Sequence, residues 1–318
     1  MTAVLLTIDT ELSPSAHKRG MAADENFQRA ILGRVSDGEW GIEYQIERLN
    51  AYGLKGVFFV EVLSAEVVGL DLLKRTVAPI LSAGHEVQLH IHTEWLEWVQ
   101  HDPVDGRRGR SICNFGLDDQ YRLLKHGIEL MTAAGAPQPV AFRAGNYGAN
   151  NDTLRALAKL GLQYDTSYNL CAPKQACRIL YASELLDPAW IDGVIEIPVT
   201  CFADYLDHRR PAQICASSAS ELGFVMAESA RLGRRTAVFV SHSFELLNRA
   251  RTRANRLLVR RFERFCELLT RGDSIGCGFT ALDYSALVNA VTAEKPLRSN
   301  TGRTLLRTAE QALGSVLY

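Results

Sequence analysis

Short apolar segments alternate with segments of helical periodicity along most of this 318-residue chain. The apolar segments have the length of buried strands, and the periodic ones repeat hydrophobic residues at a spacing of three and four. The predicted strands are 3–9, 56–61, 86–92, 139–143, 194–199 and 236–241. The predicted helices are 40–53, 70–82, 118–134, 151–161 and 219–232. This alternation predicts an α/β fold in which crossover helices join parallel strands.

The predicted strands lack the glycine-rich signatures of nucleotide-binding sheets. Neither GxGxxG nor GxxxxGK[ST] follows any of them, so a barrel is favoured over a doubly wound sheet. In a barrel, the carboxyl ends of the strands meet on one face, where the loops build the site. Two long irregular stretches, 12–38 and 97–117, are candidate covers for that face. The second contains the basic turn 105–110, which suits a phosphate or carboxylate, or is simply a solvated loop.

The end of the chain differs from the part before it. We expect one barrel domain over residues 1–285, then a polar linker and a helical tail over 286–318. The apolar residues of the tail have helical spacing and are expected to pack on the chain's own domain, although a dimer contact or a lid has the same pattern. These residues are Leu305, Leu306, Ala309 and Leu313.

Composition excludes several classes of protein. A formal charge of −1 gives no field to attract nucleic acid or an anionic membrane. The seven cysteines are scattered, odd in number and never arranged as CxxC, which excludes a disulfide scaffold and fits reduced thiols in a cytoplasm. The first residues form a strand rather than a secretion signal, and no apolar run has the length of a membrane span. We therefore expect a cytoplasmic protein.

The first strand ends in carboxylates. Thr7, Asp9 and Glu11 share one face of an extended chain, opposite Leu6 and Ile8. Two carboxylates on one face repel each other unless a cation or a proton separates them. The end of this strand is therefore a candidate for binding a cation or for sharing a proton between the two carboxylates.

The third predicted strand ends in imidazoles. Gln88, His90 and His92 alternate with apolar residues and share one face. Neutral histidine nitrogen is a preferred ligand of zinc. If the chain instead becomes helical at His90, Glu94 falls four residues later on the same helical face. Both geometries supply two ligands, and the sequence leaves the choice open.

Two further strand ends carry cations. Arg143 is followed by Gly145 and Gly148, and an arginine beside a carboxylate holds it ionised and orients it. The same segment also fits an ordinary turn into a helix capped by Asn150 or Asn151. His242 follows the very apolar segment 237–240, and a histidine there can act as general acid or base. Together the four strand ends describe a metal-assisted hydrolase.

These motifs, in this order, resemble those of the polysaccharide deacetylase family (the NodB-homology domain of carbohydrate esterase family 4). The resemblance extends from the N-terminus to His242. The segment TIDTE resembles the family's TFDD, which implies that Asp9 is the catalytic base and that Glu11 supplies the metal carboxylate. The segment 84–95 resembles GHEIGNHTxxH, with His90 at the first metal histidine and Glu94 at the second. His92 is an additional imidazole, and it is favoured over Glu94 as third ligand for its nitrogen donor.

The remaining motifs imply the other catalytic roles. FRAGNYG resembles FRxPYG, so that Arg143 orients the base and the backbone N–H of Tyr147 contributes to the oxyanion hole. Tyr164-Asp165-Thr166-Ser167 resembles the fourth motif, in which Asp165 would pair with and polarise the catalytic histidine. VSHSFE resembles the last motif, with His242 as general acid. The segment 195–199 is similar to biosynthetic members, and the family fold is a distorted, incomplete (β/α) barrel.

The resemblance implies a metal-dependent deacetylase, most simply a zinc enzyme with no further cofactor. Its expected substrate is an acetylated amino sugar, free, nucleotide-linked or lipid-linked, in surface polysaccharide or glycoconjugate biosynthesis. One alternative is a metal-dependent hydrolase of a non-sugar amide or an O-acetyl ester. The other is a non-catalytic sugar-binding barrel, which the departures at Glu11 and Glu94 motivate. The oligomeric state is left open.

Overall fold

The computed structural model describes residues 1–172, 176–271, 275–288 and 295–317. Its main strands are β1 (Ala3–Thr10), β4 (Gly56–Glu61), β5 (Glu86–Ile91), β6 (Ala141–Ala144), β7 (Tyr164–Asp165), β8 (Ala189–Ile191), β9 (Val194–Glu196), β12 (Thr236–His242) and β13 (Ile275–Gly276). They form one sheet in the order β12-β1-β4-β5-β6-β7-β9-β8, with β13 beside β1. Every pair is parallel except β8 with β9.

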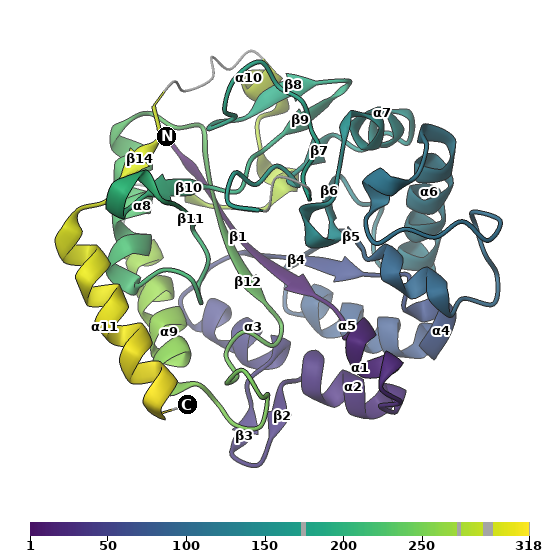
Figure 1. Ribbon diagram of the computed structural model, residues 1–318, viewed down its shortest axis with the longest axis horizontal. Coiled ribbons are helices and arrows are strands. Elements are labelled where there is room, and N and C mark those ends of the chain that lie inside the picture. Colours follow the sequence, from purple (N-terminus) through teal and green to yellow (C-terminus); the bar gives the residue numbers. More distant parts are fainter. Residues whose placement is uncertain (173–175, 272–274, 289–294, 318) are drawn as a thin grey trace.

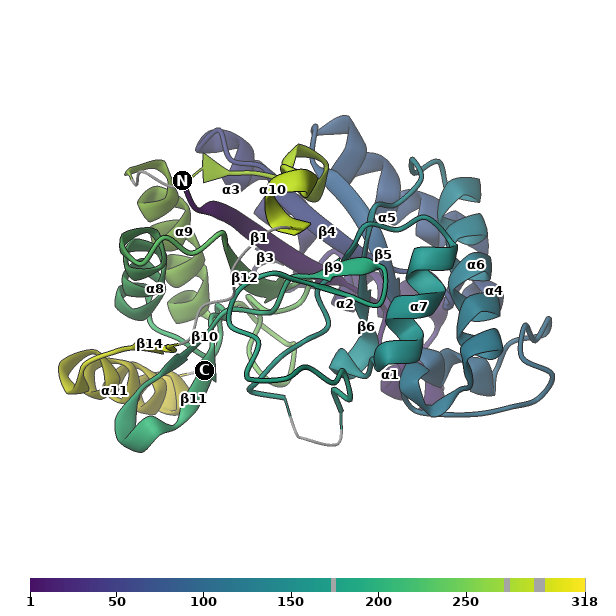
Figure 2. The same cartoon turned by 90° about the horizontal axis from the view of Figure 1, so that it is seen from above.

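Helices cover the outside of this curved sheet (Figures 1 and 2). They are α3 (Ile42–Ala51), α4 (Ala65–Val68), α5 (Leu70–Ser82), α6 (Leu117–Ala133), α7 (Asn151–Lys159), α8 (Ala219–Arg231) and α9 (Arg256–Arg271). All six predicted strands and all five predicted helices are present. The fold is the expected incomplete (β/α) barrel, since among the described residues no pairing joins β12 to β8. No described helix has both the length and the apolar character needed to cross a membrane.

The alternation along the strands separates an inner from an outer face. Leu5, Phe59 and Val238 belong to a cluster inside the barrel, whereas Leu6 and Leu89 pack outward in the larger cluster under the helices. Because alternate side chains of a strand point to opposite faces, the ionisable residues at the strand ends continue the inner face. The apolar inner cluster therefore lies beneath the site and supports it.

The predicted irregular stretch 12–38 is more ordered than expected. It contains α1 (Pro14–Lys18), α2 (Ala23–Ala30) and a hairpin of β2 (Arg34–Val35) with β3 (Gly38–Glu39). Ser13 caps α1 by accepting the Ala16 N–H, and Phe27 of α2 is buried. The prediction of an irregular segment is therefore wrong here. These helices were missed because they are too short to show a clear hydrophobic period.

The stretch 97–117 is irregular, as predicted, apart from a 3₁₀ turn at Ile112–Asn114. Its basic turn is largely ion-paired. Arg107 contacts Asp119, and Arg108 contacts Asp102. For these two arginines, the contacts favour the interpretation of the turn as a solvated loop over that of a site for a phosphate or carboxylate.

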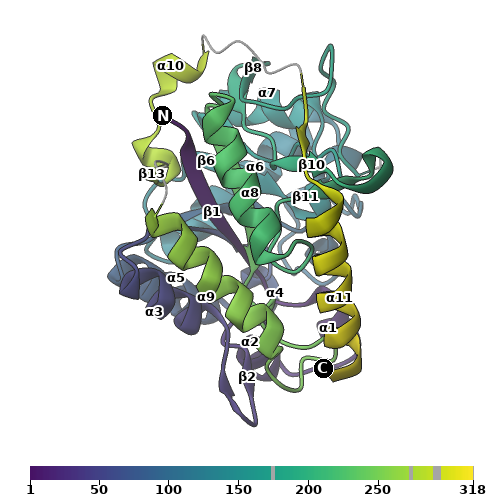
Figure 3. The same cartoon turned by 90° about the vertical axis from the view of Figure 1, so that its left-hand side faces the viewer.

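A smaller sheet and two helices complete the described part of the chain. The sheet consists of β10 (Cys201–Ala203), β11 (Arg209–Pro211) and β14 (Leu297–Arg298), and the helices are α10 (Tyr284–Val288) and α11 (Thr301–Leu317). α11, the predicted tail helix, lies beside α8 on the outside of the molecule (Figure 3). The expected boundary after residue 285 falls inside α10, and the division into domain and tail stays a prediction.

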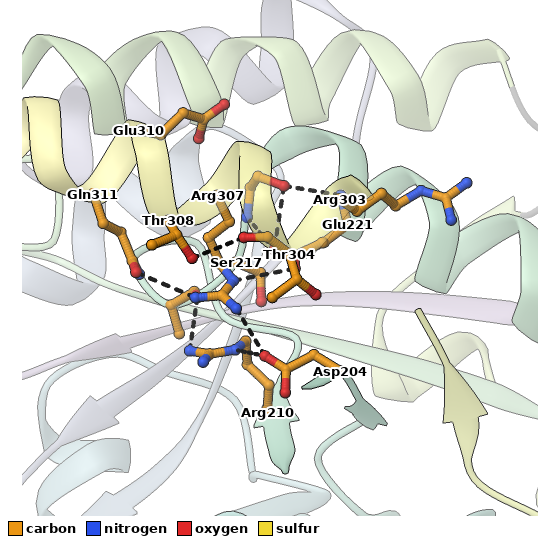
Figure 4. A network of polar contacts seen from close by, with 12 residues as sticks. Asp204, Arg210, Ser217, Glu221, Arg303, Thr304, Arg307, Thr308, Glu310 and Gln311 are labelled. Carbon is orange, nitrogen blue, oxygen red and sulfur yellow. Dashed lines mark hydrogen bonds and ion pairs between the residues drawn. The ribbon is translucent and has the colours of Figure 1, made fainter. Parts of the chain in front are cut away.

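The predicted packing of the tail through its apolar stripe is wrong for the leucines that can be examined. Leu305 is 65% exposed and Leu306 is 49% exposed, while the Leu313 side chain lies outside the described part. Instead, the buried Arg307 donates from Nη2 to Asp204 Oδ2 at 2.7 Å and from Nε to Glu221 Oε1 at 3.1 Å (Figure 4). α11 is thus held by a buried ionic network.

Candidate active site

The parallel register brings the ionisable strand ends together. Asp9 is opposite His242 across β1 and β12, and His90 is opposite Arg143 across β5 and β6. A cavity of about 690 Å³ opens at this end of the barrel. Its lining includes Asp9, Glu11, His90, His92, Arg110, Ser111, Asn114, Asn146, Tyr147, Asn169, Cys171, Arg178, Gln213 and His242.

Glu11, His90 and His92 converge in this cavity. One donor atom from each lies within 4.8 Å of the others. Glu11 Oε2 is 2.6 Å from His92 Nε2 and 3.4 Å from His90 Nε2. The other nitrogen of His90, Nδ1, donates to the Arg143 carbonyl at 2.7 Å, which leaves Nε2 as the free lone pair facing the cluster. Burial alone raises the pKa of Glu11, but His92 and His90 lower it well below its usual range.

Glu94 lies behind His92 rather than in the cluster. Its Oε2 accepts from His92 Nδ1 at 3.2 Å, and its Oε1 accepts from Asn146 at 2.8 Å. β5 stays extended to Ile91, and the chain becomes a 3₁₀ helix only at Thr93–Glu97. The alternation of His90 and His92 on one strand face is therefore the correct geometry, and a helix beginning at His90 is not formed.

This arrangement fits a divalent metal. Two imidazoles and a carboxylate are a common donor set for zinc and other transition metals. Each histidine has its second nitrogen held by an oxygen, as in metal sites where such contacts fix the tautomer and orient the ring. The structure thus favours Glu11, His90 and His92 as ligands and gives Glu94 a supporting place.

Asp9 lies between a buried arginine and a histidine. Arg143 is fully buried and donates from Nη1 to Asp9 Oδ1 at 2.5 Å and from Nη2 to Thr7 at 2.9 Å. Its guanidinium carbon also lies 4.4 Å from the centre of the Phe59 ring. Asp9 Oδ2 is 3.9 Å from His242 Nε2. Arg143 thus fixes one carboxylate oxygen and leaves the other facing the imidazole.

His242 is oriented by Glu245, three residues later. Its Nδ1 donates to Glu245 Oε2 at 2.7 Å, and the Cys215 N–H donates to Glu245 Oε1 at 2.6 Å. Burial favours the neutral imidazole, but Glu245, followed by Asp9 and Glu11, raises the pKa of His242 to about 9. His242 is therefore protonated at neutral pH, with its Nε2–H on the Asp9 side.

The predicted pairing of Asp165 with His242 is wrong. Asp165 is fully buried on β7, where its carboxylate accepts from the Ser167 hydroxyl at 2.8 Å and the Ser167 N–H at 3.1 Å. Burial and the charge of Asp165 raise the pKa of Glu196 well above its usual range. Asp165 is therefore committed to its own surroundings, and Glu245 takes the position expected of it.

The turn after β6 approaches His92 closely. Its residues form a 3₁₀ turn at Gly145–Tyr147, in which Asn146 and Tyr147 have φ values of 55° and 57°. A Cβ on Gly145 would lie 2.7 Å from His92 Cγ and from the Ile91 carbonyl oxygen, so only glycine fits. Left-handed conformations at two successive non-glycine residues are strained and are typical of functional sites. Tyr147 lines the cavity, and Asn150 caps α7, as one interpretation predicted.

Three residues near the site were not predicted. Glu245 belongs to the VSHSFE motif, and its spacing of three from His242 is the signal for it. Glu61 ends β4 opposite His90 and accepts the Leu63 and Ser64 N–H groups, the same pattern of a carboxylate at a strand end. Gln213 lies 3.5 Å from His242 Nδ1 and carries no sequence signal, because it comes from a loop.

The comparisons with known proteins are structural. No family model matches the chain, and no curated protein matches it. A solved protein assigned to the polysaccharide deacetylases of Mycobacterium smegmatis superposes with a TM-score of 0.55 and 17% identity, over 93% of this chain and 94% of that one. A family 4 carbohydrate esterase from Streptomyces lividans in complex with acetate gives a TM-score of 0.43 and 12% identity, over 92% and 98%.

A third solved protein with this fold is named for a different reaction. The 4-alpha-glucanotransferase from Thermococcus litoralis has a TM-score of 0.50 and 10% identity, over 91% of this chain and 40% of that one. Since this fold also occurs in a transferase, the barrel alone does not fix a reaction, which depends on the residues of the site. The resemblance drawn from the motifs is confirmed at the level of the fold: this chain has the incomplete barrel of the polysaccharide deacetylases.

Proposed function

We propose that this protein is a metal-dependent hydrolase that removes the acetyl group from an acetamido sugar. The observation that carries the proposal is the position of Asp9, fixed by Arg143 and facing His242 beside the Glu11–His90–His92 cluster in one cavity. Surface polysaccharide or glycoconjugate biosynthesis is the role that we infer from the motif resemblance.

Glu11, His90 and His92 would hold the metal, most simply Zn²⁺. When bound, such an ion polarises a carbonyl oxygen and lowers the pKa of water. Glu94 and the Arg143 carbonyl would keep the two imidazoles oriented toward it. Tyr147, at the strained turn, would place its backbone N–H toward the carbonyl oxygen of the substrate, where negative charge develops.

Asp9 and His242 would divide the proton transfers between them. Asp9 Oδ2, the oxygen that Arg143 Nη1 does not contact, would accept the proton of the attacking water. His242, protonated at neutral pH, would give its Nε2 proton to the departing nitrogen. Because an amine leaves only when it is protonated, a histidine held in its acid form favours amide over ester hydrolysis. The same complete acid–base pair argues against a non-catalytic barrel.

The direct test is acetate release from a panel of acetamido sugars by the Zn²⁺-loaded protein, beside Asp9→Asn. We expect turnover by the native protein and a loss of about 10²–10⁴-fold in the variant, the range for one general base. Metal content should stay the same, since Asp9 is outside the cluster. Equal turnover by both proteins would refute the role of Asp9, and acetate release from esters alone would replace the amide with an O-acetyl substrate.

A further inference from the structure

The active-site cavity continues past His242 into a cationic groove. A hollow of about 460 Å³ shares Gln213 and His242 with the cavity, and its far side includes Arg249 and Arg251. A second hollow of about 250 Å³ shares these two arginines and adds Arg19. The three spaces therefore form one path from the proposed general acid to a set of arginines.

Arg249 and Arg251 lie on a turn that hydrogen bonds hold in shape. Asn248 closes it, since its Oδ1 accepts the Thr252 N–H and its carbonyl accepts the Arg251 N–H, both at 2.8 Å. Arg251 has a φ of 54°, a strained value for a non-glycine residue. Its guanidinium carbon lies 3.7 Å from the centre of the Phe244 ring, which is itself 5.3 Å from the His242 ring. Arg251 is thus one aromatic ring away from His242.

The arginines of the groove form no ion pair within the part of the chain that the structure describes. Among the described residues, no carboxylate lies within ion-pair distance of Arg19, Arg249 or Arg251. Glu245, the acidic residue of the first hollow, is committed to His242 and to the Cys215 N–H. Burial lowers the pKa of Arg251, the charge of Glu11 raises it, and the charge of Arg19 lowers it, with a net shift downward. Arg251 is half-buried, whereas Arg19 and Arg249 are exposed. Guanidinium groups that lie close together are stabilised when an anion joins them.

We propose that this groove binds a phosphate or diphosphate ester carried by the substrate sugar. The inference rests on the proposed function, which places the departing nitrogen at His242, and it adds that the sugar extends from there into the groove. In a 2-acetamido sugar the nitrogen and an anomeric phosphate are separated by two carbons and one oxygen. A phosphate there would enter the hollow that His242 shares with Arg249 and Arg251, and a guanidinium is well suited to phosphate oxygens.

Binding is tested first, without catalysis. The probes are glucose 1-phosphate and a nucleoside diphosphate glucose, which have no acetyl group, titrated into the full-length protein at physiological salt with and without Zn²⁺. We expect binding in both conditions, weakened about tenfold or more in Arg249→Gln/Arg251→Gln. Arg260→Gln, which removes an exposed arginine of α9 outside the groove, should leave it unchanged. Binding that requires Zn²⁺, or that Arg260→Gln weakens equally, overturns the proposal.

Kinetics then separate this inference from the proposed function. With phosphate-bearing acetamido sugars, the double variant should raise KM about tenfold or more and change kcat little, while values for the neutral sugar stay the same. Nucleoside diphosphate and polyprenyl phosphate sugars form the two arms, and the arm that is preferred identifies the source of the phosphate. Turnover without any preference for phosphate overturns the groove and keeps the deacetylase. Phosphate binding without turnover on any acetamido sugar keeps the groove and overturns the deacetylase.

Discussion

At the scale of single residues, the site holds the Asp9 carboxylate and the His242 imidazole in place by separate contacts. Arg143 fixes one oxygen of Asp9 from a fully buried position, and Glu245 fixes His242 from the other side. The carboxylate and the imidazole face each other at 3.9 Å, too far for a direct hydrogen bond. A substrate or water placed between them would contact both, as an acid–base pair requires.

The pH dependence of activity should report on the contact between His242 and Glu245. The pKa of His242 is raised to about 9, so its acid form is present at neutral pH and is lost as the pH rises through about 9. In Glu245→Gln the charge disappears while the burial remains, and the pKa of His242 should fall. We expect the alkaline limb of the kcat profile to move to lower pH by about one unit or more. An unmoved alkaline limb would show that another group sets it.

Most of the site residues follow from the sequence because they end strands. Asp9, His90 and His242 each follow an apolar alternating segment, so their position on the inner face is fixed by the strand. Glu245 and Gln213 come from loops, whose paths no periodic pattern specifies. The pairing of Asp165 with His242 came from a motif resemblance, and the nearby Glu196 and Ser167, which depend on the tertiary fold, give Asp165 other partners.

At the scale of elements, the turn after β6 connects the strand that carries Arg143 to the Glu11–His90–His92 cluster. Gly145 lies against the His92 ring and the Ile91 carbonyl, so the turn limits how His92 can be placed. The backbone after it is strained at Asn146 and Tyr147, and Asn146 also contacts Glu94. One short turn therefore supports a proposed ligand and the proposed oxyanion donor.

A methyl group at Gly145 should disturb metal binding. In Gly145→Ala the new Cβ would overlap His92 and the Ile91 carbonyl, and His92 would have to move. We expect Zn²⁺ affinity to fall by about 10–100-fold, as when a contact that supports a ligand is lost. Gly116→Ala is the matched control, since a Cβ there meets no atom within 4 Å. Equal affinity in both variants, measured by competition with a chromogenic chelator, would contradict the coupling.

The elements themselves were predictable in proportion to their periodicity. The long strands and helices of the barrel have clear patterns and are formed where expected. α1, α2 and the two-residue strands are too short to show a period. The predictions omit α9, although Leu258, Phe262, Phe265 and Leu269 repeat at helical spacing and are buried. The sequence therefore contains a clear signal for α9.

At the scale of the whole molecule, a buried ionic network attaches the C-terminal helix. Arg307 lies between Asp204 of the small sheet region and Glu221 at the start of α8, and all three side chains are at most 5% exposed. Arg261 of α9 pairs with Glu310 at 2.8 Å in the same contact. The stripe of leucines therefore gives the wrong orientation for α11, because spacing does not reveal that a buried arginine replaces an apolar contact.

Removal of Arg307 should destabilise the protein far more than a change in the leucine stripe. Arg307→Met removes the cation that pairs with the buried Glu221, while Asp204 keeps Arg210, and breaking a buried pair in this way typically costs about 3–5 kcal/mol of the free energy of unfolding. Leu305→Gln changes a side chain that is 65% exposed and should stay within about 0.5 kcal/mol. Urea unfolding of both variants measures this difference. Equal effects would mean that the network does not anchor α11.

The measurement that tests the central claim most directly is the metal content of the purified protein, determined by elemental analysis beside His90→Ala. The convergence of Glu11, His90 and His92 predicts about one divalent ion per chain, lost in His90→Ala. His101→Ala, which removes an 88% exposed imidazole outside the cavity, should keep its metal. A native protein that neither contains metal nor takes up Zn²⁺, or a His90→Ala variant that binds it equally, would contradict the account.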